Sequence, residues 1–156
     1  MKKKKVMFIS SVGGHLTQML ELKSLFNDYD YVLITEKNDV TKELKDKYNI
    51  NYLMYGSRFY MLKYILVIIV NFFKSIYLFF KYNPSTIVTT GTHTAVVMCY
   101  LGFIFRRKVI YIESFAKRKD KTMSGKLIYP IATTFIVQWE SMLKLYPKAK
   151  YFGGIY

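Results

Sequence analysis

The chain has few acidic residues, one cysteine and neither of the common nucleotide-binding motifs. Only 10 Asp and Glu stand against 24 Lys and Arg among its 156 residues, so the formal net charge is +14 at pH 7. The shortage is sharpest in the middle of the chain, where no acidic residue occurs between Asp46 and Glu113. Such a charge excess predicts attraction to an anionic partner: nucleic acid, acidic lipid or a phosphorylated substrate.

A single cysteine excludes an intramolecular disulfide and fits a reducing compartment. Cys99 lies within an apolar run, which predicts a small core residue rather than a nucleophile. The basic start, Lys2 to Lys5, imitates the charged region of a signal peptide, but the apolar run after it is too short and lacks a small-residue cleavage site. We therefore expect a basic lead-in to the first strand.

The first apolar run, Val6 to Ile9, is followed by Ser-Ser-Val-Gly-Gly-His at 10–15 and then by a helical pattern. This order predicts a strand, a glycine turn and a helix. Gly13 and Gly14 would let a ligand approach the backbone, and Thr17 falls in the first helical turn, where free N–H groups favour an anion or a hydroxyl. A plain strand-to-helix turn remains the alternative, because neither G-x-G-x-x-G nor a Walker Gly-Lys-Ser/Thr occurs.

Short apolar runs alternate with helical patterns along the whole chain. Strands are predicted at 6–9, 31–35, 50–55, 86–91, 109–112, 133–138 and 150–152. Helices are predicted at 16–26, 39–48, 59–80, 92–105, near Leu127 and at 140–145. Strands of this length between helices indicate an α/β fold, with a parallel sheet and helices on both faces, built as one domain over residues 1–156.

Ligands of such sheets bind beyond the carboxyl ends of the strands. Three polar segments fall there: Gly13-Gly14-His15, Gly91-Thr92-His93 and Glu113-Ser114-Phe115. Both histidines of the chain come just after a glycine at a strand end, and a carboxylate ends a third strand. We therefore expect a functional site at this edge of the sheet. The prediction includes no metal and no cofactor.

Residues 59–80 form a long apolar segment, interrupted by Lys63 and Lys74. At ~100° per residue, Lys63, Lys74 and Lys81 fall within about 20° of each other on a helix. A lysine stripe beside a broad apolar face is typical of a helix lying in the membrane interface, which we predict over residues 59–81. The candidate membrane contacts are Lys63, Phe72, Phe73, Lys74, Phe79, Phe80, Arg106 and Arg107. A core helix and a spanning helix remain alternatives.

Three stretches of the chain resemble a known family. They are SSVGGHLTQML near the start, VTTGTHTAV in the middle, and IYIESFAKRK…SGKLIYPIA…FIVQWE…YPKAKYFG at the end. Together they resemble the bacterial relatives of the membrane-anchoring, acceptor-side subunit of the eukaryotic two-chain, dolichol-linked N-acetylglucosaminyltransferase. The resemblance covers essentially the whole chain. Bacterial members of this family occur in capsular and exopolysaccharide gene sets.

The resemblance implies a Rossmann-like domain equivalent to the N-terminal half of a GT-B glycosyltransferase, similar to the N-terminal domain of the peptidoglycan lipid II-forming transferase. Such a half holds the acceptor and the membrane, so a separate donor-binding subunit is implied. The implied reaction transfers a sugar from a UDP-sugar to a polyprenyl-pyrophosphate-linked saccharide, at the anionic cytoplasmic face of the cell membrane. A non-catalytic anchor or enhancer of the true transferase is the alternative.

The resemblance also implies roles for the residues at the sheet edge. His15 would be the general base for the attacking hydroxyl, or its hydrogen-bond partner. Glu113 matches a family glutamate and is the second catalytic candidate; a structural role, in which it caps its loop through backbone N–H groups, is the alternative. Ser114-Phe115 stand where Gln-Asn follows this glutamate in the peptidoglycan enzyme, so this chain lacks that asparagine. The substrate-binding candidates are Gly13, Gly14, Thr17, Gly91, Thr92, His93 and Ser114.

The partner interface is expected at Trp139 and at the aromatic residues Tyr151, Phe152 and Tyr156. Trp139 can instead belong to the core. A basic nucleic-acid-binding module is the rival from another class, and it would interleave aromatic residues with Lys and Arg on one surface. The aromatics instead cluster within 59–80, away from the basic loop 117–121, so we expect no nucleic-acid partner.

Overall fold

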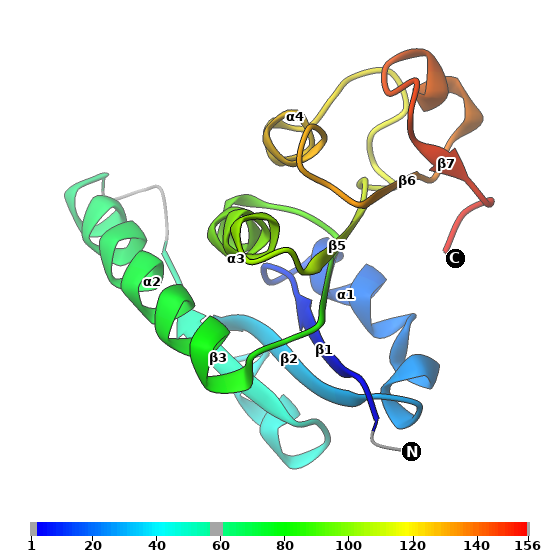
Figure 1. Cartoon of the computed structure of the whole chain (residues 1–156). Coiled ribbons are helices and arrows are strands. Elements are labelled where there is room, and N and C mark those ends of the chain that lie inside the picture. Colours follow the sequence, from blue (N-terminus) through cyan, green and yellow to red (C-terminus); the bar gives the residue numbers. More distant parts are fainter. Residues whose placement is uncertain (1–2, 57–60, 156) are drawn as a thin grey trace.

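Seven parallel strands form one sheet in the order β3-β2-β1-β4-β5-β6-β7 (Figure 1). The computed structural model describes residues 3–56 and 61–155. The strands are β1 Lys5–Ile9, β2 Asp30–Lys37, β3 Ile50–Met54, β4 Thr86–Thr89, β5 Lys108–Ile112, β6 Thr134–Val137 and β7 Lys150–Tyr151. The parallel α/β sheet expected from the alternating pattern is therefore confirmed.

Within residues 3–56 and 61–155, four α-helices and three 3-10 helices connect these strands. They are α1 Gly14–Leu20, η1 Lys23–Asn27, η2 Lys42–Asp46, α2 Met61–Tyr82, α3 His93–Ile104, α4 Met123–Ile128 and η3 Glu140–Lys144. The helix predicted at 16–26 is divided between α1 and η1, and those predicted at 39–48 and 140–145 are short 3-10 turns. These segments close i→i+3 bonds, such as Leu44 N to Thr41 O at 3.0 Å, because they are too short to propagate an α-helix.

Both faces of the sheet carry an apolar core. Val6 and Phe8 pack with α1 and η1 on one face, whereas Met7 and Ile9 pack with α2, α3 and α4 on the other. Successive residues of a strand point to opposite faces, so a strand buried on both sides reads as one continuous apolar run. This explains why the sequence shows short apolar blocks rather than a polar–apolar alternation.

The chain reverses its direction of travel across the sheet between β1 and β4. Strand β1 pairs with β2 on one side, where Ile9 lies opposite Ile34, and with β4 on the other, where Ile9 lies opposite Thr89. Strands β2 and β3 extend one way from this point, and β5, β6 and β7 extend the other way. In open parallel sheets the carboxyl end of such a switch point is the usual ligand site.

Helix α2 lies along the outside of the molecule, next to α3 (Figure 1). At ~1.5 Å per residue its 22 residues extend about 33 Å. Only Ser75, Leu78 and Phe79 of this helix are buried, so most of its apolar side chains face outward. By length and composition it could cross a membrane, and it is the single such helix within residues 3–56 and 61–155.

The prediction that Phe79 contacts a membrane is wrong. This side chain is 1% exposed and packs in the core, with its ring centroid 5.5 Å from that of Phe105. The carboxyl-terminal part of α2 packs on the core and against the end of α3, so Phe79 is covered. Phe72, Phe73 and Phe80 remain exposed.

The basic residues near the helix ends divide between the two edges of the sheet. Lys63 lies at the amino end of α2 and is exposed, whereas Lys74 is half-buried. Arg106 and Arg107 follow α3 at the opposite edge, and the Arg107 guanidinium donates to Asn83 Oδ1 at 2.8 Å. Residues 59–60 of the predicted membrane helix, and Tyr156, lie outside the described residues.

Candidate functional site

Both loops at the switch point contain backbone conformations that L-residues rarely adopt. Gly13, the N-cap of α1, has a φ of 80°, and Gly91 has a φ of 104°. Thr92, the N-cap of α3, has a φ of 82° although it is β-branched. Strained positions of this kind concentrate at functional sites. A Cβ on Gly13 would meet no atom within 4 Å, so this turn is open to a ligand.

Gly91 serves packing rather than ligand access. A Cβ at this position would lie 2.8 Å from the hydroxyl of Tyr111, which is buried. By contrast Gly14 and Thr17 are exposed on the first turn of α1. The substrate-binding candidates of the first loop therefore lie on open surface. In the second loop, Gly91 instead lets the backbone pass close to the Tyr111 hydroxyl.

His15 joins the two loops across the switch point. Its Nδ1 donates to the carbonyl of Thr90 at 2.8 Å, and the Thr90 hydroxyl donates to the carbonyl of His15 at 2.7 Å. A carbonyl can only accept, so Nδ1 carries the proton and Nε2 of the neutral ring keeps its lone pair. The half-buried His15 thus has the tautomer that a general base requires.

His93 lies beside a carboxylate that was not among the predicted site residues. Its side chain is 46% exposed, and its Nε2 lies 3.8 Å from Oε1 of Glu36. The hydroxyl of Thr94 donates to the same oxygen at 2.7 Å. Glu36 is buried near the end of β2. The sequence signal was available, because Glu36 follows an apolar strand as Glu113 does.

Glu113 is sealed inside the protein, and its predicted catalytic contact with substrate is wrong. The residue is 1% exposed. Its carboxylate accepts from Ser114 N at 2.8 Å, from the Thr122 hydroxyl at 2.9 Å and from the Tyr146 hydroxyl at 2.8 Å. Thr122 also caps α4 by accepting from Gly125 N at 2.9 Å. Glu113 therefore joins the end of β5 to the start of α4.

The surroundings of Glu113 leave no room for a ligand. A Cβ on Gly125 would lie 2.3 Å from Glu113 Oε2 and 2.5 Å from the Tyr146 hydroxyl. Burial and the nearby Glu113 raise the pKa of both Tyr111 and Tyr146, which keeps the two phenols protonated. Ser114, predicted to bind substrate, is buried beside them. The hydrogen bond from its backbone N–H to the Glu113 carboxylate holds Ser114 in this position.

Trp139 holds the loop that follows β5. Its indole N–H donates to the carbonyl of Phe115 at 2.7 Å, and the guanidinium of Arg118 lies 3.7 Å from its ring centre. The side chain is half-buried. Farther along, Tyr151 is 41% exposed and Phe152 is 74% exposed. The tail thus presents aromatic surface, whereas most polar contacts of Trp139 are internal.

The remaining chemistry is limited. Within residues 3–56 and 61–155, no three His, Cys, Asp or Glu lie close enough together to hold a metal ion. Burial raises the pKa of the Cys99 thiol to about 12, which agrees with its predicted place in the core.

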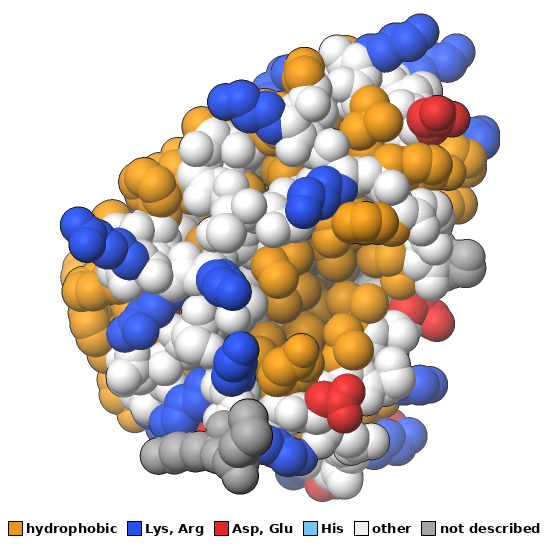
Figure 2. Space-filling view, turned by 45° about the vertical axis from the view of Figure 1, so that its right-hand side comes forward, with side chains coloured by type: hydrophobic (Ala, Val, Ile, Leu, Met, Phe, Trp, Pro, Cys, Tyr) orange, Lys and Arg blue, Asp and Glu red, His pale blue; other side chains and the backbone are white. Residues whose placement is uncertain are grey.

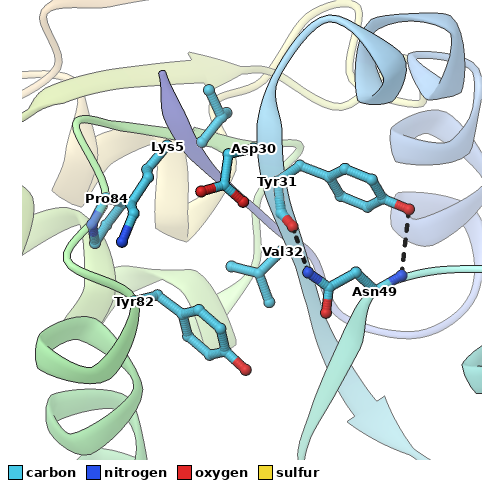
Figure 3. A pocket seen from close by; sticks show the side chains of 8 residues that line it. Lys5, Asp30, Tyr31, Val32, Asn49, Tyr82 and Pro84 are labelled. Carbon is cyan, nitrogen blue, oxygen red and sulfur yellow. Dashed lines mark hydrogen bonds between the residues drawn. The ribbon is translucent and has the colours of Figure 1, made fainter. Parts of the chain in front are cut away.

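Two hollows lie away from this edge. One, of about 150 Å³, is at the amino ends of β1 and β2, where Lys5, Asp30 and Tyr82 surround it (Figure 3). The other is a groove of about 500 Å³ with the hydrophobic floor seen in Figure 2. Its floor includes Val88, Ile110 and Ile136, on the sheet face that carries α1, where the described part of the chain places no helix over β4, β5 and β6. An uncovered face of a parallel sheet is unusual.

Solved structures with this arrangement define the class of protein. Acinetobacter baumannii MurG superposes with a TM-score of 0.75 at 14% identity, over 97% of this chain and 45% of MurG. UDP-N-acetylglucosamine 2-epimerase from Rickettsia bellii gives 0.73 at 13% identity, over 98% of this chain and 45% of the epimerase. The fold is therefore the Rossmann-like N-terminal half of the GT-B architecture.

The sequence identifies the family. Residues 6–155 match the family described as "Oligosaccharide biosynthesis protein Alg14 like", and the chain belongs to it. A Yarrowia lipolytica protein named UDP-N-acetylglucosamine transferase subunit ALG14 is 34% identical over 90 residues, 54% of this chain and 42% of that protein. The human protein of the same name is 35% identical over 81 residues, 48% of this chain and 38% of that protein. The chain thus spans less than half of either relative.

Proposed function

We propose that this chain is the membrane-associated, acceptor-side subunit of a two-chain glycosyltransferase in bacterial capsule or exopolysaccharide synthesis. The observation that carries the proposal is that this member of the Alg14-like family has the fold of one half of a GT-B architecture and covers 45% of MurG. In the proposed reaction a sugar passes from a UDP-sugar to a saccharide linked to undecaprenyl pyrophosphate. The donor site belongs to a separate subunit.

The outward face of α2 supports a membrane-bound position on the cytoplasmic face of the cell membrane. Leu66, Phe73 and Phe80 on this face are 63%, 65% and 55% exposed. Lysines stand near both ends of the helix, Lys63 and Lys81, where a helix lying flat would offer them to acidic headgroups. The edge of the sheet that carries the candidate site and the opposite edge that carries Arg106 and Arg107 can then both touch the same membrane surface.

The groove and the tail support a partner subunit. The groove floor is apolar, and Ile155 packs against the core cluster to which the floor residues belong. Phe152 adds exposed aromatic surface nearby in the chain. Interfaces concentrate their binding energy in such anchors. The donor-binding subunit is proposed to cover this side of the molecule.

The switch-point edge supports the chemistry. Nε2 of His15 is proposed to take the proton of the acceptor hydroxyl as its oxygen attacks the anomeric carbon of the UDP-sugar. The bond from that carbon to UDP breaks, UDP leaves with the electron pair, and the proton passes from His15 to solvent. His15→Ala should lower turnover of the two-chain complex roughly 10²–10⁴-fold. His15→Gln should be nearly as slow, because an amide cannot accept the proton.

Reconstitution tests the proposal. The chain, a donor-binding subunit co-purified with it, and both together are added to vesicles carrying undecaprenyl-pyrophosphate-linked N-acetylglucosamine and to UDP-N-acetylglucosamine. Labelled lipid-linked product should form only when both chains are present. Full turnover by the donor-binding subunit alone would contradict an acceptor-side role. A normal rate for His15→Ala with assembly intact would favour the alternative function, a non-catalytic anchor.

A further inference from the structure

Glu36 is the carboxylate that the switch-point edge keeps within reach of a ligand. Its side chain is 6% exposed, and it points to the face of the sheet that carries α2 and α3. Oε1 accepts from the Thr94 hydroxyl at 2.7 Å, whereas Oε2 makes no hydrogen bond with any described residue. Within the described chain no Lys or Arg forms an ion pair with it. Oε2 is therefore free to accept a hydrogen bond from a ligand, and it is not among the buried side-chain atoms that lack a partner.

Glu36 is one of the residues that line a small cavity. Its volume is about 80 Å³, and its polar lining consists of Glu36, Asn71, Ser75, His93 and Thr94. Residues Tyr64, Val67 and Val97 line its apolar side. One water takes up about 30 Å³ of liquid volume, so the cavity holds a group of a few heavy atoms but not a sugar ring. Two of the lining residues, Tyr64 and the half-exposed His93, contact each other with their rings 5.8 Å apart between centroids.

Among the described residues, Glu36 is the one acidic residue of the cavity lining, and the Asn71 amide in the same lining is already bonded to the backbone of Met54. An ionised carboxylate only accepts hydrogen bonds, so it selects a donor such as a hydroxyl or an amide N–H. An inorganic phosphate or pyrophosphate has the opposite requirement and is repelled by the negative charge. The ligand group therefore belongs to the sugar of a lipid-linked saccharide rather than to its pyrophosphate. The outward face of α2 begins directly beside the cavity, where a membrane-borne saccharide would arrive.

We propose that Glu36 is a specificity-determining residue that accepts a hydrogen bond from a hydroxyl or amide N–H of the acceptor saccharide. Thr94 is its positioning residue, because its hydroxyl holds Oε1 and leaves Oε2 for the ligand. This inference rests on the proposed function, in which the chain holds the acceptor. Neither residue is required to take a proton.

Binding to two lipids separates sugar recognition from lipid binding. The full chain, with its donor-binding subunit, is titrated with vesicles carrying either undecaprenyl pyrophosphate or undecaprenyl-pyrophosphate-linked N-acetylglucosamine. Glu36→Gln should weaken binding of the sugar-bearing lipid about 10-fold to 100-fold, as expected for loss of a hydrogen bond to a charged group. It should leave binding of the sugar-free lipid unchanged. Thr94→Val should give a smaller loss with the same selectivity.

Glu43→Gln is the matched control, because it removes the same charge from the nearby surface helix η2. It should leave both affinities unchanged. Equal affinity of wild type and Glu36→Gln for the sugar-bearing lipid would overturn the inference, as would a parallel loss for both lipids with a lower melting temperature. These outcomes concern binding alone. Absence of sugar transfer by a wild-type complex that still prefers the sugar-bearing lipid would contradict the proposed reaction and leave the Glu36 result standing.

Discussion

Replacing Glu113 by alanine should destabilise the fold rather than act on a chemical step. The carboxylate is 1% exposed and accepts hydrogen bonds from Ser114 N, Thr122 and Tyr146 at 2.8, 2.9 and 2.8 Å. Glu113→Ala would leave these three donors without their acceptor; Ser114 and Tyr146 are buried, and Thr122 is half-buried. Each such donor costs about 1–3 kcal/mol.

The sum of these costs is reduced by partial repair. The Thr122 hydroxyl already lies 3.1 Å from the Tyr111 hydroxyl and can bond to it instead. We therefore expect a loss of about 3–5 kcal/mol in the free energy of unfolding, out of a typical total of about 5–15 kcal/mol. Glu113→Gln keeps the shape and one acceptor oxygen, so it should lose about 1–3 kcal/mol.

Urea unfolding in mild detergent measures these losses. Trp139 is the single tryptophan of the chain, and its indole contacts the loop after β5, so its fluorescence reports on this region. The Glu113→Gln complex, where folded, should transfer sugar at a rate within a few-fold of wild type. Normal stability combined with a rate lowered 100-fold or more would refute the structural role and restore Glu113 as a catalytic residue.

Three further predictions concern the phenols, the membrane and the partner. Burial and Glu113 raise the pKa of Tyr146 above the value near 10 of an unfolded tyrosine, so only the unfolded state ionises as pH rises past about 10. Stability should therefore be fully present below pH 10 and fall above it in urea unfolding, with a shallower fall in Tyr146→Phe; equal slopes would contradict this assignment. Phe72→Ser with Phe73→Ser should weaken sedimentation with anionic vesicles, and salt should weaken wild-type binding without abolishing it; unchanged binding would exclude α2 as the contact. Deleting residues 151–156 should prevent co-purification with the donor-binding subunit, and retention of the complex would place the interface elsewhere.

The order and type of the main elements could be predicted because local patterns determine them. Residues that are adjacent in sequence form both buried faces of β1, and the Gly13-Gly14 pair indicates the turn that follows this strand. The convergence of His15 with the β4 loop followed from the rule that parallel strands end at one edge. The lengths of η2 and η3 could not be predicted, since their polar patterns fit either kind of helix.

The roles of the carboxylates depend on tertiary contacts that the sequence pattern does not contain. Glu113 and Glu36 both end apolar strands, yet Glu113 meets Tyr146 from a distant segment and is sealed, whereas Glu36 borders a cavity. Phe79 was misplaced for the same reason. Phe79 belongs to the apolar face of the helix that was predicted to meet the membrane, but the core and the end of α3 cover it.

The central claim is that this chain holds the acceptor and a second chain holds the donor. Equilibrium binding tests it most directly, with labelled UDP-N-acetylglucosamine and with vesicles carrying undecaprenyl-pyrophosphate-linked N-acetylglucosamine. The chain alone should bind the lipid-linked saccharide and should bind the nucleotide sugar far more weakly than the two-chain complex does. Binding of UDP-N-acetylglucosamine by the chain alone as tightly as by the complex would contradict the claim.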